Sequence, residues 1–99
     1  MEHWPPLSSA SVVARRDGFI EAEIDDEIVF LNIEQGTCYG LNRVGSRIWN
    51  LLAEPARIGD LCTRLLTEFR VDPLVCEHEV LALLQELCAE GLISTLEKT

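Results

Sequence analysis

The chain has 99 residues, of which 47% are hydrophobic and 25% are charged. This length allows one domain with one core, and the composition excludes both a disordered chain and a membrane-spanning one. The formal net charge of −9 also argues against nucleic acid as a partner, because binding to phosphate depends on Lys and Arg.

The first eleven residues contain His3, Trp4 and two prolines without a sustained period. This predicts an irregular N-terminal arm, residues 1–11, ahead of a domain that spans residues 12–96. The arm has neither the basic start nor the long apolar run of a secretory signal peptide. We therefore expect a cytoplasmic protein.

Short apolar runs at residues 12–13, 19–24, 28–33 and 37–41 are separated by turn-forming residues such as Asp17-Gly18, Asp25-Asp26 and Gly36. Runs of strand length divided by such short turns pair as antiparallel neighbours. The pattern predicts a three-stranded antiparallel sheet whose last member is the strand at 37–41. The tail at 92–99 is compatible with a short extended piece or with a frayed end.

A helical period begins after Asn42, a candidate N-cap, and three helices are expected. The first ends near Pro55, and the second occupies residues 58–69. Asp72 and Pro73 suit the N-cap and first position of a third helix, which Gly91 would end. The sequence therefore predicts an α+β domain in which the three-stranded antiparallel sheet is followed by a three-helix bundle.

No catalytic or metal-binding group is evident. The two histidines are His3 and His78, and Cys76 and His78 point to different sides of a helix, so they cannot form a nucleophile–base pair. The cysteines lie in apolar runs without a C-x-x-C pair, which favours buried free thiols over a metal site or a disulfide framework. They are Cys38, Cys62, Cys76 and Cys88. We expect a protein that is not an enzyme and uses no cofactor or metal.

The third helix has more apolar surface than one stripe requires. Beside its core-facing stripe, a second line contains Leu74, His78 and Leu81. This line either widens the core contact or forms one wall of a groove. In the second case the strand at 37–41 would form the other wall, since an edge strand can accept an extended peptide. Tyr39 and Leu81 would then line its pockets.

Several segments resemble the PqqD family over roughly residues 19–93. They are IVFLNIEQGTCYGLN at 28–42, Gly45-x-x-Ile48-Trp49, and the helical pattern Glu79-Val80-x-x-x-Leu84-x-x-Leu87-x-x-x-Gly91-Leu92. The resemblance implies a winged-helix-turn-helix-like domain that acts as a recognition element for ribosomally made, post-translationally modified peptides. Such an element binds the leader of a precursor peptide and is not itself catalytic.

The resemblance also implies a site, in which the leader adds as a strand beside residues 37–41 and lies against the third helix. The strand positions are Thr37, Cys38, Tyr39, Gly40 and Leu41. The helix positions, chosen by periodicity, are Leu74, Glu77, His78, Leu81 and Gln85.

The segments IWNLLAEP at 48–55 and FRVD at 69–72 are similar to stand-alone leader-binding proteins of lasso-peptide pathways. This likeness implies two further partners, a leader peptidase of the cysteine-protease type and a ring-closing cyclase. One departure is Arg57, which stands where relatives usually place a Thr or Ser cap, so the start of the second helix is less well defined.

Two alternatives remain open at this stage. A winged-helix regulator would bind DNA, but no Lys or Arg occurs between positions 71 and 97 to contact phosphate. A permanent subunit of an enzyme assembly would use the same groove for a fixed partner, and a larger, more apolar interface would distinguish it.

Overall fold

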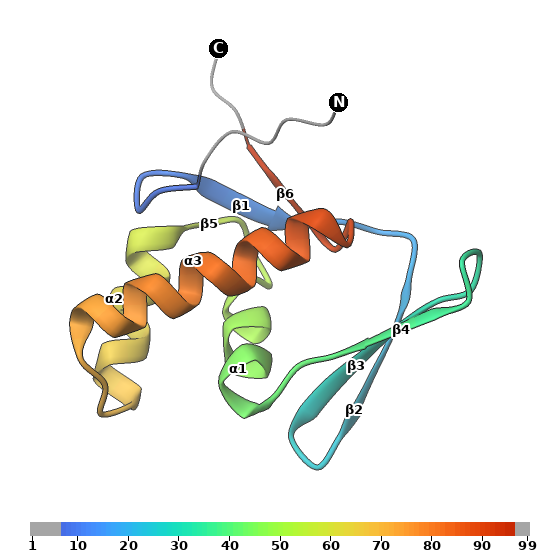
Figure 1. The fold of residues 1–99 in the computed structure, drawn as a ribbon, viewed down its shortest axis with the longest axis horizontal. Coiled ribbons are helices and arrows are strands. Elements are labelled where there is room, and N and C mark those ends of the chain that lie inside the picture. The colour runs from blue at the N-terminus through green and yellow to red at the C-terminus, as the bar shows by residue number, and fades with distance from the viewer. Residues whose placement is uncertain (1–6, 97–99) are drawn as a thin grey trace.

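A computed structural model of the chain describes residues 7–96, and residues 1–6, most of the predicted arm, lie outside it. Figure 1 shows a helical body from which a sheet extends to one side. The elements in chain order are β1 (Val12–Arg15), β2 (Ile20–Ile24), β3 (Glu27–Asn32), β4 (Thr37–Gly40), α1 (Arg43–Leu51), β5 (Ala56–Arg57), α2 (Ile58–Glu68), α3 (Pro73–Ala89) and β6 (Ile93–Thr95).

The predicted three-stranded sheet is confirmed as the antiparallel meander β2-β3-β4. Asp25 and Asp26 connect β2 to β3 with φ angles of 53° and 67°, the left-handed pair that a two-residue hairpin turn requires. Phe30 of β3 lies opposite Tyr39 of β4. The local turn residues therefore set the register of the sheet that the sequence predicted.

A second small sheet, of order β5-β1-β6, was not predicted. The run at 12–13 does not join the meander, because Val13 pairs with Ala56 on one side and Thr95 on the other. The undecided tail thus contains a strand, β6. Strands of two to four residues that pair across more than forty positions leave no periodic pattern in the sequence, which explains why the prediction missed this sheet.

The N-caps of α1 and α3 are confirmed. Asn42 Oδ1 accepts the Gly45 amide at 2.8 Å, and Asp72 Oδ1 accepts the Leu74 amide at 2.9 Å. α2 has no side-chain cap at Arg57 and instead continues directly from β5. None of the helices in residues 7–96 is both long and apolar enough to cross a membrane.

As predicted, Gly91 terminates α3, and its φ of +79° lies in the left-handed region. The Gly91 amide donates to the Cys88 carbonyl at 3.0 Å, and the Leu92 amide donates to the Leu87 carbonyl at 2.9 Å. These two bonds form a Schellman motif. The turn sends the chain from α3 into β6.

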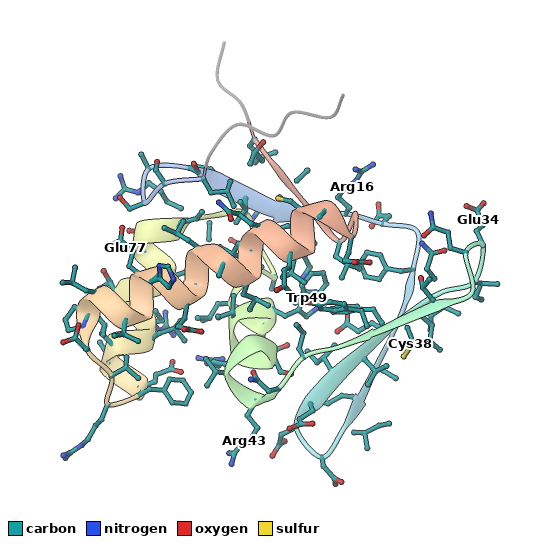
Figure 2. The ribbon with its side chains drawn as sticks, viewed as in Figure 1. Arg16, Glu34, Cys38, Arg43, Trp49 and Glu77 are labelled. Atoms are coloured by element: carbon teal, nitrogen blue, oxygen red, sulfur yellow. The ribbon has the colours of Figure 1, made fainter. Side chains whose placement is uncertain are left out.

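Trp49 of α1 lies at the centre of the core and is fully buried. Figure 2 shows Trp49 between α3 and the sheet. Its ring packs edge-on against Phe30, with 4.6 Å between the centroids, and the Arg15 guanidinium lies 4.4 Å above it. At the junction of β4 and α1, buried Ser46 accepts the Ile28 amide at 2.9 Å and donates to the Leu41 carbonyl at 3.3 Å. These contacts hold β4 in a fixed position relative to the helices.

Candidate functional site

β4 forms an open edge of its sheet, since only β3 pairs with it within the described residues. The Leu41 amide donates to the Ile28 carbonyl at 2.8 Å. Because backbone groups alternate sides along an antiparallel strand, those of Thr37 and Tyr39 also face β3. The amide and carbonyl groups of Cys38 and Gly40 therefore point to the open edge.

Tyr39 connects this edge strand to α3. Its hydroxyl donates to Glu86 Oε1 at 2.7 Å. Burial raises the pKa of Tyr39 to about 12, helped by the hydrogen bond to Glu86 and by the negative charges of Glu86 and Glu90. The Tyr39 hydroxyl is therefore neutral in the site. Its hydrogen bond to Glu86 shows which flank of α3 faces β4.

A groove with a volume of about 430 Å³ lies along the same flank of α3. Its apolar wall includes Val44 at the start of α1, Phe69 after α2, and Val75 and Leu83 on α3. Val44 and Val75 are 44% and 55% exposed, so their side chains are open to a ligand. Glu79 and Glu86 add negative charge along α3.

The structure brings four of the five predicted strand residues to the surface. Thr37, Cys38 and Gly40 are exposed and Tyr39 is half-buried. Leu41 is an exception, because its side chain is only 4% exposed and belongs to the core. Leu41 can therefore contribute to the site only through its backbone position.

The structure does not bring the predicted helix residues to β4. Leu81 is five positions before Glu86 and so lies about 140° around the helix axis. By the same geometry Leu74 and Glu77 lie about 120° and 180° from Glu86, on the same far side. His78 and Gln85 lie about 80° and 100° from Glu86, and both are exposed to solvent. Figure 2 shows Glu77 on the side of α3 away from the strand that contains Cys38. The buried stripe with Val80 and Leu84 separates this far flank from the groove.

Sequence reasoning missed Val75, Glu79 and Glu86 as groove residues. Their steps of four and seven place them on one helix face, but the mixture of apolar and acidic types is typical of a solvated surface. Leu83 also lines the groove, although it is partly buried against the core. The helical spacing was the only sequence signal for these groove residues. The position of β4 was needed to decide which of the two flanks of α3 forms the groove.

The cysteines differ from the prediction in part. Cys76 and Cys88 are buried as expected, whereas Cys38 is exposed and Cys62 is half-buried. Burial, with a contribution from neighbouring Cys76, raises the pKa of the Cys62 thiol to about 11, which lowers its reactivity. In the described part of the chain, no three His, Cys, Asp or Glu residues gather in a way that could hold a metal ion.

The chain matches a protein family and resembles solved structures. The family model for coenzyme PQQ synthesis protein D (PqqD) matches residues 27–93. The structure of TbiB1 in complex with the TbiA(beta) leader peptide is 34% identical in sequence, with a TM-score of 0.75, over 86% of this chain and 99% of that one.

A structure of lasso peptide synthetase B1 complexed with the leader peptide is 22% identical, with a TM-score of 0.68, over 83% of this chain and 96% of that one. At this identity the likeness shows a shared fold. No curated protein matches the chain significantly.

Proposed function

The chain belongs to the PqqD family, and from this premise we propose that it binds the leader segment of a ribosomally synthesised precursor peptide, as a recognition element in lasso-peptide maturation. The observation that supports this most is the open edge of β4 beside the groove on α3. TbiB1, the relative at 34% identity, forms a complex with a leader peptide. The family resemblance predicted from residues 28–92 is confirmed.

In the proposed complex, the leader adds to β4 as a further antiparallel or parallel strand. The outward backbone groups of Cys38 and Gly40 supply main-chain hydrogen bonds. A Cβ atom added at Gly40 would meet nothing within 4 Å, so the space beside this residue is open to a peptide backbone. Alternate leader side chains would then point toward α3.

Affinity would come from a few apolar anchors in the groove. Ordering an extended peptide costs conformational entropy, which main-chain bonds offset only in part. Val44, Val75 and Leu83 offer apolar contact at the groove wall. Burial of such surface contributes about 25 cal/mol per Å². We therefore place the helix side of the site on this flank and not on the flank of Leu81.

The proposed unit is the domain at residues 12–96, since β1 and β6 lie at its two ends. We propose that it presents the bound leader to a cysteine-protease-type leader peptidase and then to a ring-closing cyclase, in the cytoplasm where the precursor is made. The chemistry would belong to those partners. In support, Cys76 is buried and His78 is exposed, and two positions apart on α3 they point to different sides of the helix, so this pair offers no base for the thiol.

Two adjacent substitutions test the placement of the leader. Val75→Asp puts a carboxylate in the groove, and Leu74→Asp puts the same charge on the far flank of the same helical turn. Both positions are exposed, at 55% and 78%, so the fold should tolerate both. We expect Val75→Asp to weaken leader binding by about tenfold or more, equivalent to ~1.4 kcal/mol.

The measurement is fluorescence anisotropy with two labelled peptides, the TbiA(beta) leader and the leader of the precursor encoded beside this chain's gene. A scrambled peptide and duplex DNA serve as controls. Loss of binding in Leu74→Asp with full binding in Val75→Asp would move the site to the far flank. Failure of the wild-type chain to bind either leader, or binding of DNA alone, would overturn the proposed function.

A further inference from the structure

The side of the β2-β3-β4 sheet that faces away from the helices is apolar. Directly paired residues on antiparallel strands point to the same face, and the register aligns Ile20 with Leu31 and Leu31 with Cys38. By the same pairing, Ala22, Val29 and Gly40 share that face. We call this surface, together with Ile24 at the end of β2, the outer face. It is opposite the face that holds Phe30 in the core.

The outer face remains open to solvent in the described structure. Ile20, Ile24 and Leu31 are 48%, 61% and 42% exposed. A sheet with one face on the core normally alternates apolar and polar side chains, so that its solvated face is polar. Here β2 reverses that order, because its exposed glutamates, Glu21 and Glu23, are opposite the core residues Phe30 and Ile28. The packing of this domain does not require an apolar outer face, and such exposed patches commonly mark interfaces.

The charge around the outer face restricts what can cover it. Residues 17–42 contain seven acidic side chains and no Lys or Arg. All seven are exposed. Glu21 and Glu23 point to the opposite face, whereas Glu27 pairs with Ile24 on the outer face. The border of the outer face is formed by Asp17 before β2 and by the turn residues Asp25, Asp26 and Glu34. A second copy of this chain would bring two such acidic borders together, and like charges across an interface disfavour association. A surface with an apolar centre and basic residues around it would be complementary in both respects.

We propose that the outer face binds a folded protein whose contact surface is apolar at the centre and rich in Lys and Arg at the rim, and that this protein is the leader peptidase. This inference rests on the proposed function. We choose the peptidase because β4 contributes both to the proposed leader site and to the outer face. The edge groups of Cys38 and Gly40 meet the leader, while the side chain of Cys38 lies on the outer face. A protein on that face would therefore sit one strand away from the bound leader.

The test compares Leu31→Lys, at the middle of the outer face, with Leu74→Lys, the same change at an exposed position on the far flank of α3. The probe is the purified leader peptidase encoded in the same gene cluster, and its binding to the full chain is measured by biolayer interferometry without leader. We expect Leu31→Lys to weaken peptidase binding at least tenfold and Leu74→Lys to leave it within twofold. Wild-type affinity should also fall as ionic strength rises, because the rim contacts are electrostatic.

Leader binding by anisotropy, measured on the same variants, separates this inference from the proposed function and reports the fold. If Leu31→Lys loses its circular dichroism signal, Ile24→Lys at the exposed end of β2 replaces it. A wild-type chain that binds leader but not peptidase would overturn the inference and leave leader recognition standing. So would equal peptidase binding by the two Lys variants, or concentration-dependent self-association that Leu31→Lys abolishes. A chain that binds the peptidase but no leader would overturn only the proposed function.

Discussion

Tyr39 is the side chain through which the edge strand reaches α3, and its ionisation reports that contact. Burial is the main reason that its pKa is raised to about 12, and the hydrogen bond and charge of Glu86 add to the effect. Since the chain contains one tyrosine, the ultraviolet absorbance of phenolate measures Tyr39 alone. We expect Glu86→Gln to lower this pKa without restoring the ordinary value, because the burial remains.

The direction of the shift also defines a pH window for stability. With the folded pKa above the unfolded value of 10.0, Tyr39 is neutral in both states below pH 10, and its contribution to stability is complete there. As pH rises from 10 to about 12, the unfolded chain releases its proton first, and the contribution is lost. A wild-type titration at the ordinary tyrosine pKa would contradict the Tyr39–Glu86 contact.

Some residue roles were predictable from neighbours in sequence, and others were not. The capping roles of Asn42 and Asp72 depend on backbone amides within three positions, so a short window of sequence is sufficient. The choice between Leu81 and Leu83 as a groove residue depends on where β4 passes α3. That position is set by a contact between Tyr39 and Glu86, 47 residues apart, which periodicity cannot supply.

At the scale of elements, the same distinction separates the two sheets. The meander was predictable because its strands are consecutive and its turns have left-handed residues at Asp25, Asp26 and Gly36. The β5-β1-β6 sheet was not, because a two-residue strand such as β5 has no period of its own. The unpredicted strands explain the start of α2, where Arg57 ends β5 and stands at the N-cap without a side-chain bond.

The open edge of β4 predicts a specific effect of proline. Cys38→Pro would remove an amide that faces the edge while leaving the bonds between β4 and β3 in place, and proline is tolerated in edge strands at such positions. We expect leader affinity to fall by about fivefold or more, as one hydrogen bond contributes ~1 kcal/mol. Cys38→Ala removes the thiol and keeps the amide, so it should bind the leader normally. Anisotropy measures both variants, and equal affinity would show that the leader does not pair with β4 at this residue.

At the scale of the molecule, the two sheets serve different purposes around one core. The β2-β3-β4 sheet extends away from the helices (Figure 1). It presents the open edge of β4 and the outer face. The β5-β1-β6 sheet joins segments from both ends of the described chain to α2 and α3. Arg15 of β1 links this sheet to the core, where it donates to the Trp49 carbonyl at 2.6 Å.

If β6 is an integral part of the fold, its buried side chain should affect the stability of the whole domain. Ile93 is 1% exposed and pairs with Arg15, whereas Leu96, just after β6, is 48% exposed. Removing the buried methyl groups in Ile93→Ala should lower the free energy of unfolding by about 2–5 kcal/mol, a large part of the ~5–15 kcal/mol typical of a domain. Leu96→Ala should change it by no more than about 0.5 kcal/mol, as is usual at an exposed site. Urea unfolding followed by far-ultraviolet circular dichroism gives both values, with the Trp49 indole resonance as a second probe.

Because both sheets pack on Trp49 through Phe30 and Arg15, the two probes should give one transition. Separate transitions would mean that β6 and β1 unfold independently of the leader-binding sheet.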